Sequence, residues 1–249
     1  TEGLTVSMIG LYNSIMEKET YLPTPTKCHY VFNLRDVSKI FESISKVKGA
    51  FYTREYFIKL WVHECFRTFH DRFLTDDDKY LFREIIGKLI EVNLGVGLRD
   101  CQIKDNRDSI FVDFVADSYE EVNDFEELKK TILTKIETNK NYSHMVFFDQ
   151  AINYICYINR ILNKNIGGHG LLIGTGASGR TSSIKMACEL SNFKIVQINS
   201  AKETKIKEWK EFIKQTIKDA GTNNEKTCLI IQENDIFSDS IMEDLNYII

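Results

Sequence analysis

The sequence contains very little proline and no C-x-x-C pair, and both absences narrow the possible folds. Its two prolines among 249 residues, Pro23 and Pro25, stand close together, so long helices are unimpeded over most of the length. The six cysteines are scattered along the chain. This spacing favours free thiols in a reducing compartment over a disulfide framework or a zinc site.

Hydropathy and charge make two classes of partner improbable. No apolar run approaches the roughly 20 residues that a bilayer crossing needs, so we expect no membrane partner. The net charge is −4, so no overall positive charge argues for nucleic acid. An apolar content of 43% is ordinary for a packed globular protein. Since Thr1 is not a natural start and residues 246–249 look like an interrupted helix, we expect a piece of a larger polypeptide.

Residues 1–95 are predicted to be almost entirely helical. Apolar side chains spaced at the helical period predict helices over residues 4–19, 54–73 and 76–94. A further helix should begin near Asn33, because Asn33 and Asp36 have the spacing of a capping box. Taken alone, Arg35 between them would be an exposed arginine in a helix cap.

From residue 96 onward the pattern predicts strands that alternate with helices. The predicted strands cover residues 109–114, 170–173, 194–198 and 227–231, and the predicted helices cover residues 126–138, 147–162, 180–190, 203–220 and the stretch from 239. Such alternation implies a parallel sheet covered on both faces. The predicted fold class is therefore α/β, with a helical subdomain over residues 1–95, an α/β domain over residues 96–249 and a boundary at about 95–108.

The most informative motif lies at residues 170–181. It has the P-loop pattern G-x-x-x-x-G-K-[ST] after an apolar stretch, except that Arg180 stands in the lysine position. Glycines let consecutive backbone N–H groups surround a phosphate, and the N-terminus of the following helix adds partial positive charge. Thr181 stands where a hydroxyl would bind Mg²⁺. The motif predicts a nucleotide site; the alternative is a structural turn.

Two departures from the P-loop pattern bear on catalysis. The guanidinium of Arg180 is always charged and can bind phosphate, but it is bulkier than an ammonium group. About fifty residues further on, an apolar stretch ends in Gln232 and Glu233, where an Asp-Glu pair would hold Mg²⁺ and polarise the attacking water. Gln232 has no charge, whereas Glu233 keeps the catalytic position. The two departures predict a nucleotide binder with slow or no hydrolysis.

With these residues identified, the chain resembles the motor of dynein heavy chains, a ring of six AAA+ modules, over nearly its whole length. The phrases at residues 21–36 (YLPTPTKCHYVFNLRD) and 60–73 (LWVHECFRTFHDRF) look like the small helical (lid) subdomain of the third module. Residues 144–151 (HMVFFDQA) are similar to the entry of the fourth module. Since the fourth P-loop of axonemal dyneins commonly carries arginine, Arg180 fits that branch.

The resemblance implies roles for individual residues. The P-loop AAA+ α/β subdomain of the fourth module, truncated at its C-terminus, would hold ATP or ADP with Mg²⁺. Its nucleotide-binding residues would be Gly174, Thr175, Gly176, Ala177, Ser178, Gly179, Arg180, Thr181 and Ser182, with Val146 and Phe147 beside the adenine. Thr181 would bind the metal, Glu233 would be the catalytic carboxylate, and Arg35 would be a sensor for the neighbouring module's nucleotide.

The resemblance also implies a function for the parent protein, an ATP-driven, minus-end-directed microtubule motor of the axoneme in cilia and flagella. This segment would bind a regulatory nucleotide and relay conformational change around the ring. Its partners would be the other AAA+ modules of the heavy chain, dynein intermediate and light chains, and microtubules through regions outside this chain. Two alternatives stay open: a stand-alone P-loop nucleotide kinase or hydrolase, and a purely structural AAA+ module with an empty pocket.

Overall fold

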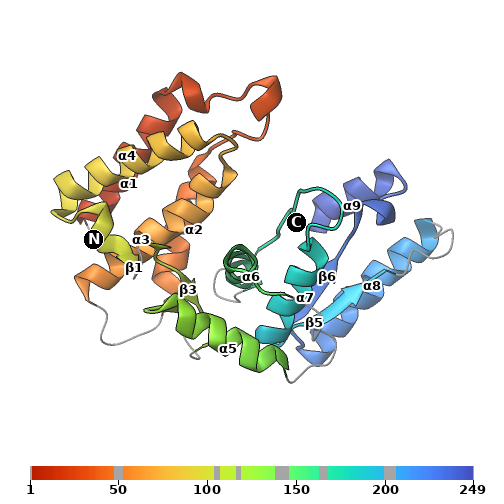
Figure 1. Cartoon of the computed structure of the whole chain (residues 1–249). Coiled ribbons are helices and arrows are strands. Elements are labelled where there is room, and N and C mark those ends of the chain that lie inside the picture. Colours follow the sequence, from red (N-terminus) through yellow and green to blue (C-terminus); the bar gives the residue numbers. More distant parts are fainter. Residues whose placement is uncertain are drawn as a thin grey trace. The chain divides into compact units, whose positions relative to one another are not determined.

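The computed structural model describes residues 2–47, 53–103, 107–115, 119–137, 146–162, 168–198 and 206–248. The chain forms two compact units, one from the described residues up to Leu133 and one from those that follow (Figure 1). Within the described ranges, no helix combines the length and apolar character that a membrane crossing requires.

The first unit is mainly helical. Its elements are α1 (Glu2–Glu17), η1 (Glu19–Tyr21), η2 (Pro25–Lys27), α2 (Leu34–Lys46), α3 (Arg54–Thr68), η3 (His70–Arg72), α4 (Asp76–Leu94), η4 (Leu98–Cys101), β1 (Gln102–Ile103), β2 (Arg107–Asp108), β3 (Phe111–Val112), β4 (Glu120–Glu121) and most of α5 (Phe125–Glu137). Helix α1 lies along α4, and α2 packs on α3 (Figure 1).

The second unit contains the candidate nucleotide site. Its elements are α6 (Asp149–Leu162), α7 (Arg180–Leu190), β5 (Lys194–Gln197), α8 (Ile206–Asn223), β6 (Thr227–Ile230), η7 (Glu233–Asp235) and α9 (Asp239–Ile248). The start of the helix predicted over 203–220 lies outside the described residues. Strands β5 and β6 pair in parallel, which confirms the predicted parallel arrangement.

The core of the first unit draws large apolar side chains from all four long helices. Leu11 of α1, Ile40 of α2, Trp61 of α3 and Phe82 of α4 are each 0% exposed. Burying a side chain of this size contributes about 1.5–3 kcal/mol. Because this gain exceeds the differences in helix propensity, packing of the apolar faces determines where the helices lie.

The capping box predicted at the start of α2 is present. The backbone N–H of Asp36 donates to Asn33 Oδ1 at 3.2 Å, and the backbone N–H of Asn33 donates to Asp36 Oδ2 at 3.1 Å. Helix α2 therefore begins at Leu34, as the sequence indicates. Helix α4 begins after Thr75, whose side chain accepts from the backbone N–H of Asp78, and it ends at Leu94, just before Gly95, where φ is +67°.

A buried carboxylate fixes the segment between α1 and α2. Asp78 is 1% exposed, and its Oδ2 accepts a hydrogen bond from Tyr30 at 2.8 Å and from Lys27 Nζ at 2.7 Å. The hydroxyl of Tyr21 donates to the backbone oxygen of Asp78 at 3.0 Å. Three side chains of the phrase at residues 21–36 thus converge on the first turn of α4.

Arg72 joins the two phrases on which the family resemblance rests. Its Nη1 donates to Asp36 Oδ2 at 3.2 Å, and its Nη2 donates to the backbone oxygens of Val31 at 2.7 Å and His29 at 3.2 Å. The guanidinium also lies over the ring of Phe32, with its carbon 4.6 Å from the ring centroid. A planar group with several donors suits such a site, and a lysine would not replace it.

Two strand predictions are wrong. Of residues 109–114, only Phe111 and Val112 form a strand, and it pairs with β4 in an antiparallel hairpin rather than in a parallel sheet. Residues 170–173 form no strand, and Leu171 and Ile173 are 86% and 85% exposed. The described parallel sheet consists of β5 and β6 and does not include this apolar stretch.

The first compact unit extends further than the predicted helical subdomain. Residues that follow position 95 pack on α3: Tyr56 donates to the backbone oxygen of Tyr119 at 2.8 Å, and Lys59 Nζ lies 2.9 Å from Glu121 Oε1. These contacts join partners about sixty positions apart, which no local pattern in the sequence reveals. The family modules assigned to residues 1–95 and 96–249 stay a prediction.

The environment of Asp78 gives a stability prediction. Burial by itself would raise the pKa of this carboxyl, but hydrogen bonds from Lys27, Thr75 and Tyr30 outweigh burial and leave the pKa below its ordinary value. The unfolded chain therefore holds the proton more tightly. The stabilisation is present at neutral pH and is lost as the pH falls below about 3.9 and through the lower folded pKa.

We expect Asp78→Asn to weaken this anchor by about 1–3 kcal/mol, because a hydrogen-bonded buried charge is lost. Hydrogen exchange of the backbone amides in residues 21–31 should accelerate. Asp76→Asn is the matched control, since it removes the same charge from the same turn at an exposed position. Equal exchange rates in the two variants would contradict this account.

Candidate nucleotide site

The P-loop runs from Gly174 to Gly179 and leads directly into α7. Two of its residues have left-handed backbone conformations, Ala177 with φ of 58° and Gly179 with φ of 79°. Tight turns that include left-handed residues form concavities in which backbone N–H groups bind anions. Gly179 caps α7 without a side chain, so it makes no side-chain bond to the N–H groups of the first helical turn.

The predicted phosphate-binding residues are accessible. Gly174, Thr175, Gly176, Ala177, Ser178 and Gly179 are exposed, and Arg180, Thr181 and Ser182 are half-buried. The hydroxyl of Ser183 donates to the backbone oxygen of Gly179 at 3.0 Å and ties the loop to the first turn of the helix. The loop is therefore an open, ordered turn at a helix N-terminus.

Arg180 folds back toward its own loop. Its Nη2 donates to the backbone oxygen of Thr175 at 3.4 Å, a long hydrogen bond. The guanidinium consequently lies beside the turn that would hold the phosphates. Arginine binds phosphate oxygens in a bidentate manner, so this position suits a phosphate contact.

The end of β6 meets the P-loop, as the spacing of the two motifs predicts. Gln232, two residues beyond β6, donates from Nε2 to Thr181 Oγ1 at 3.4 Å, across 51 positions of sequence. The parallel pairing of β5 with β6, in the register Lys194 with Thr227, positions the end of the strand. Two of the predicted site elements therefore lie together, and a neutral amide makes the contact.

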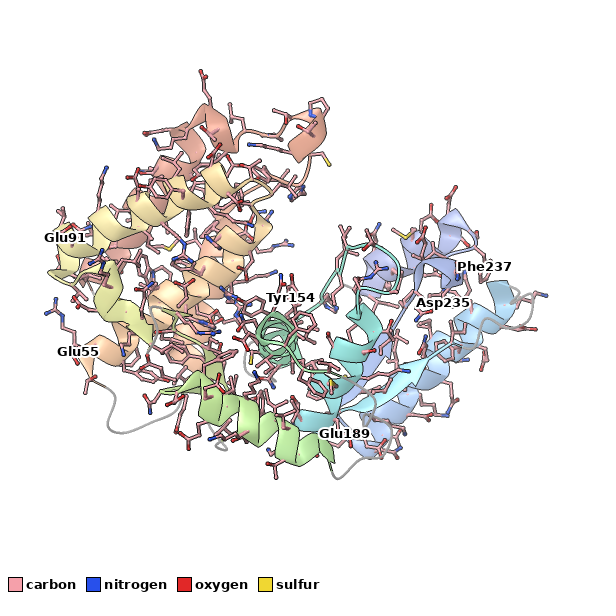
Figure 2. All side chains as sticks on the ribbon, in the orientation of Figure 1. Glu55, Glu91, Tyr154, Glu189, Asp235 and Phe237 are labelled. Carbon is pink, nitrogen blue, oxygen red and sulfur yellow. The ribbon has the colours of Figure 1, made fainter. Side chains whose placement is uncertain are left out.

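Asp235 supports the site, although the sequence reasoning did not identify it. It is 2% exposed, and its Oδ2 accepts from the backbone N–H of Gln232 at 2.8 Å, which closes the turn η7. Figure 2 labels Asp235 on this turn after β6. The signal in the sequence is an acidic residue three positions after Gln232, the spacing of a capping box.

A pair of thiols joins α7 to β6. The hydrogen bond with Cys228, followed by burial, raises the pKa of Cys188 well above its ordinary value. The same hydrogen bond lowers the pKa of Cys228, against the effect of burial. The hydrogen bond between the two thiols thus links the helix that follows the P-loop to the strand that precedes Gln232.

The remaining predicted site residues are not brought together by a described contact. Glu233 is exposed at the start of η7, Val146 is 85% exposed, and Phe147 is half-buried just before α6. Residues 144 and 145 of the same phrase lie outside the described residues. Arg35 is exposed on α2 in the first unit. The roles predicted for these residues, adenine contact, catalysis and sensing, stay predictions.

The residues of the loop do not fit a site that fixes Mg²⁺ by itself. Mg²⁺ binds oxygen ligands and is usually held through one or two carboxylates together with substrate phosphates. Here Thr181 offers a hydroxyl, Gln232 offers an uncharged amide, and the carboxylate of Asp235 accepts from the backbone of the turn. Within the described ranges, no cluster of three or more His, Cys, Asp or Glu could hold a metal ion.

Two family models match the chain. Residues 144–249 match the family described as P-loop containing dynein motor region D4, and residues 1–79 match the family described as Dynein heavy chain, ATPase lid domain. The chain belongs to the dynein heavy chain family. Residues 1–79 are a dynein lid domain, and residues 144–249 belong to an α/β domain of the P-loop type.

Curated relatives agree with the family models. The chain is 33% identical, over 99% of its length, to human "Dynein axonemal heavy chain 2". It is 30% identical, over its whole length, to the Chlamydomonas reinhardtii "Dynein-1-beta heavy chain, flagellar inner arm I1 complex" and to mouse "Dynein axonemal heavy chain 1". The chain spans about 6% of the length of each of these heavy chains.

The backbone of the loop gives a second prediction. Gly179→Ala should destabilise the P-loop by about 1–2 kcal/mol, because a residue with a Cβ is strained at a left-handed φ. Hydrogen exchange in residues 174–183 should accelerate and nucleotide affinity should fall. Gly221→Ala, in the exposed part of α8, is the control and should stabilise its helix by up to about 1 kcal/mol. The same sign in both variants would refute the strain argument.

Proposed function

We propose that this segment binds an adenine nucleotide, ATP or ADP, at residues 174–182 and serves a dynein motor as a regulatory module with slow or absent hydrolysis. The observation that carries the proposal is the meeting of Thr181 with Gln232 beside a P-loop that contains Arg180. The arrangement keeps the groups that bind phosphate and lacks the acidic residue at the end of the strand.

Binding and turnover make different demands on the site. Phosphate binding needs backbone N–H groups, a helix N-terminus and a cation, and the loop, α7 and Arg180 provide all three. Phosphoryl transfer also needs a metal that bridges the phosphates and a group that positions the attacking water. Glu233 remains the candidate for the second role, and Gln232 cannot supply charge for the first.

For the whole heavy chain we propose an ATP-driven, minus-end-directed microtubule motor in the axoneme of a cilium or flagellum. Support comes from relatives named as axonemal heavy chains, of which this chain spans about 6%. The proposed partners are the other AAA+ modules, the dynein intermediate and light chains, and microtubules through other regions. Family membership argues against the stand-alone kinase or hydrolase.

A structural module with an empty pocket is the second candidate. The hydrogen bond from Arg180 to the backbone oxygen of Thr175 favours this candidate. An arginine that is bonded to its own loop can occupy the place of the phosphates and keep the nucleotide out. The two candidates differ in one measurable property, the presence of nucleotide at this site in the assembled motor.

Substitution of Arg180 tests the proposal. In the intact motor, Arg180→Ala should lower nucleotide affinity at this site roughly 10- to 100-fold, because a charged hydrogen bond contributes about 1.5–3 kcal/mol. Photolabelling with an azido-adenine nucleotide, read on peptides of residues 146–248, measures the occupancy, and microtubule gliding measures the effect on the motor. Lys207→Ala, which removes an exposed cation from α8, is the control.

Arg180→Lys should retain binding, because a cation remains in the loop. If Arg180→Ala changes neither occupancy nor gliding speed, the regulatory role is wrong. If the wild-type motor shows no label on these peptides, the structural module is the correct reading.

A further inference from the structure

We propose that this site binds its nucleotide without a divalent cation, with Arg180 and Gln232 taking the place that Mg²⁺ has in other P-loops. The inference rests on the nucleotide binding proposed above. It comes from a disagreement between the motif, which leads one to expect a metal, and the groups that surround Thr181.

In a P-loop site with magnesium, the loop hydroxyl and an acidic residue at the end of a strand hold the metal, which bridges the β- and γ-phosphates. Both positions are present here and close together. Thr181 provides the loop hydroxyl, and Gln232 stands in the position of the acidic residue. The two side chains are directly hydrogen-bonded, because Gln232 Nε2 donates to Thr181 Oγ1 at 3.4 Å. The amide N–H of Gln232 directs a partial positive charge toward the hydroxyl oxygen. A carboxylate in the same position would instead offer a negatively charged ligand to a cation.

The nearby carboxylates do not replace the missing ligand. Asp235 is buried, and its Oδ2 accepts from the backbone N–H of Gln232 at 2.8 Å. Rotating that group toward a metal would break this hydrogen bond and open the turn that it closes. Glu233 is exposed on the first position of η7 and stands where it would act on water, not on the metal.

Arg180 can neutralise phosphate charge in place of the cation. Its guanidinium is a cation with five N–H donors in a planar fork. One of these donors contacts the backbone oxygen of Thr175, so the group already lies beside the loop. A phosphate offers stronger acceptors than this carbonyl at 3.4 Å, and the guanidinium can exchange the one contact for the other.

The Thr181 hydroxyl also gains a different role. Held by Gln232 Nε2, its oxygen is an acceptor, and its own proton is available to a phosphate oxygen. The site would thus hold the phosphates with the loop N–H groups, the Thr181 hydroxyl and the Arg180 fork. Each of these groups is a hydrogen-bond donor.

The test uses the intact motor that contains this segment and an azido-adenine nucleotide, with label counted on peptides of residues 146–248. Labelling is measured over a range of nucleotide concentration in excess Mg²⁺ and in excess EDTA. We expect the two half-saturating concentrations to agree within about threefold, because no contact of the site depends on the metal. Label that appears only with Mg²⁺ would overturn the inference and leave the proposed nucleotide binding intact.

Absence of label under both conditions would instead refute the nucleotide binding, and with it the inference. Two variants sharpen the result. Gln232→Asp restores the acidic ligand and should make binding at least about tenfold weaker in EDTA than in Mg²⁺. Asn234→Asp makes the same change of amide to carboxylate at an exposed position two residues away and should leave the wild-type behaviour unchanged. Equal metal dependence in the two variants would contradict the role assigned to Gln232.

Discussion

The parallel pairing of β5 with β6 is the constraint on which the candidate site depends. Four residue pairs fix its register, from Lys194 with Thr227 to Gln197 with Ile230. Side chains alternate between faces along an extended chain, so a slip by one residue would turn every side chain to the other face. The register therefore helps decide that Gln232, and not Glu233, meets Thr181. The side chain that reaches Thr181 is therefore an amide and not a carboxylate.

In the first unit, charged groups with many partners hold the irregular segments. Asp78 accepts hydrogen bonds from Tyr21, Lys27 and Tyr30. Arg72 donates hydrogen bonds to backbone oxygens within residues 29–31. Hydrogen bonds formed between segments far apart in the chain specify a unique arrangement, which apolar packing alone does less well. Within the lid domain, a side chain of the phrase at residues 60–73 thus holds the backbone of the phrase at residues 21–36.

Local chemistry made much of the fold predictable from the sequence. The capping box of Asn33 and Asp36 determines the start of α2, and the P-loop motif determines that α7 begins at Arg180. The motif spacing also predicted that the end of β6 would reach the P-loop. These predictions succeeded because the interactions that determine each structure lie within a few residues of sequence, as in the capping box, or within a motif that adopts the same geometry in many proteins, as in the P-loop.

The failures have a common physical cause. A strand exists only when another segment supplies backbone partners, so the apolar residues 170–173 could not be assigned from their own composition. The extent of the first unit depends on contacts such as Tyr56 with Tyr119, and the contact between Cys188 and Cys228 depends on how α7 packs on β6.

The charge of the site connects these observations to the proposed role. A lysine, an aspartate and Mg²⁺ would together give a loop one positive charge more than Arg180 and Gln232 do. With less positive charge, the site compensates less of the negative charge that a triphosphate brings or that phosphoryl transfer spreads over the phosphate oxygens. Ground-state binding depends on donors that are already fixed, so it suffers less than transfer does. The same two residues therefore favour the proposed binding of a nucleotide over its hydrolysis.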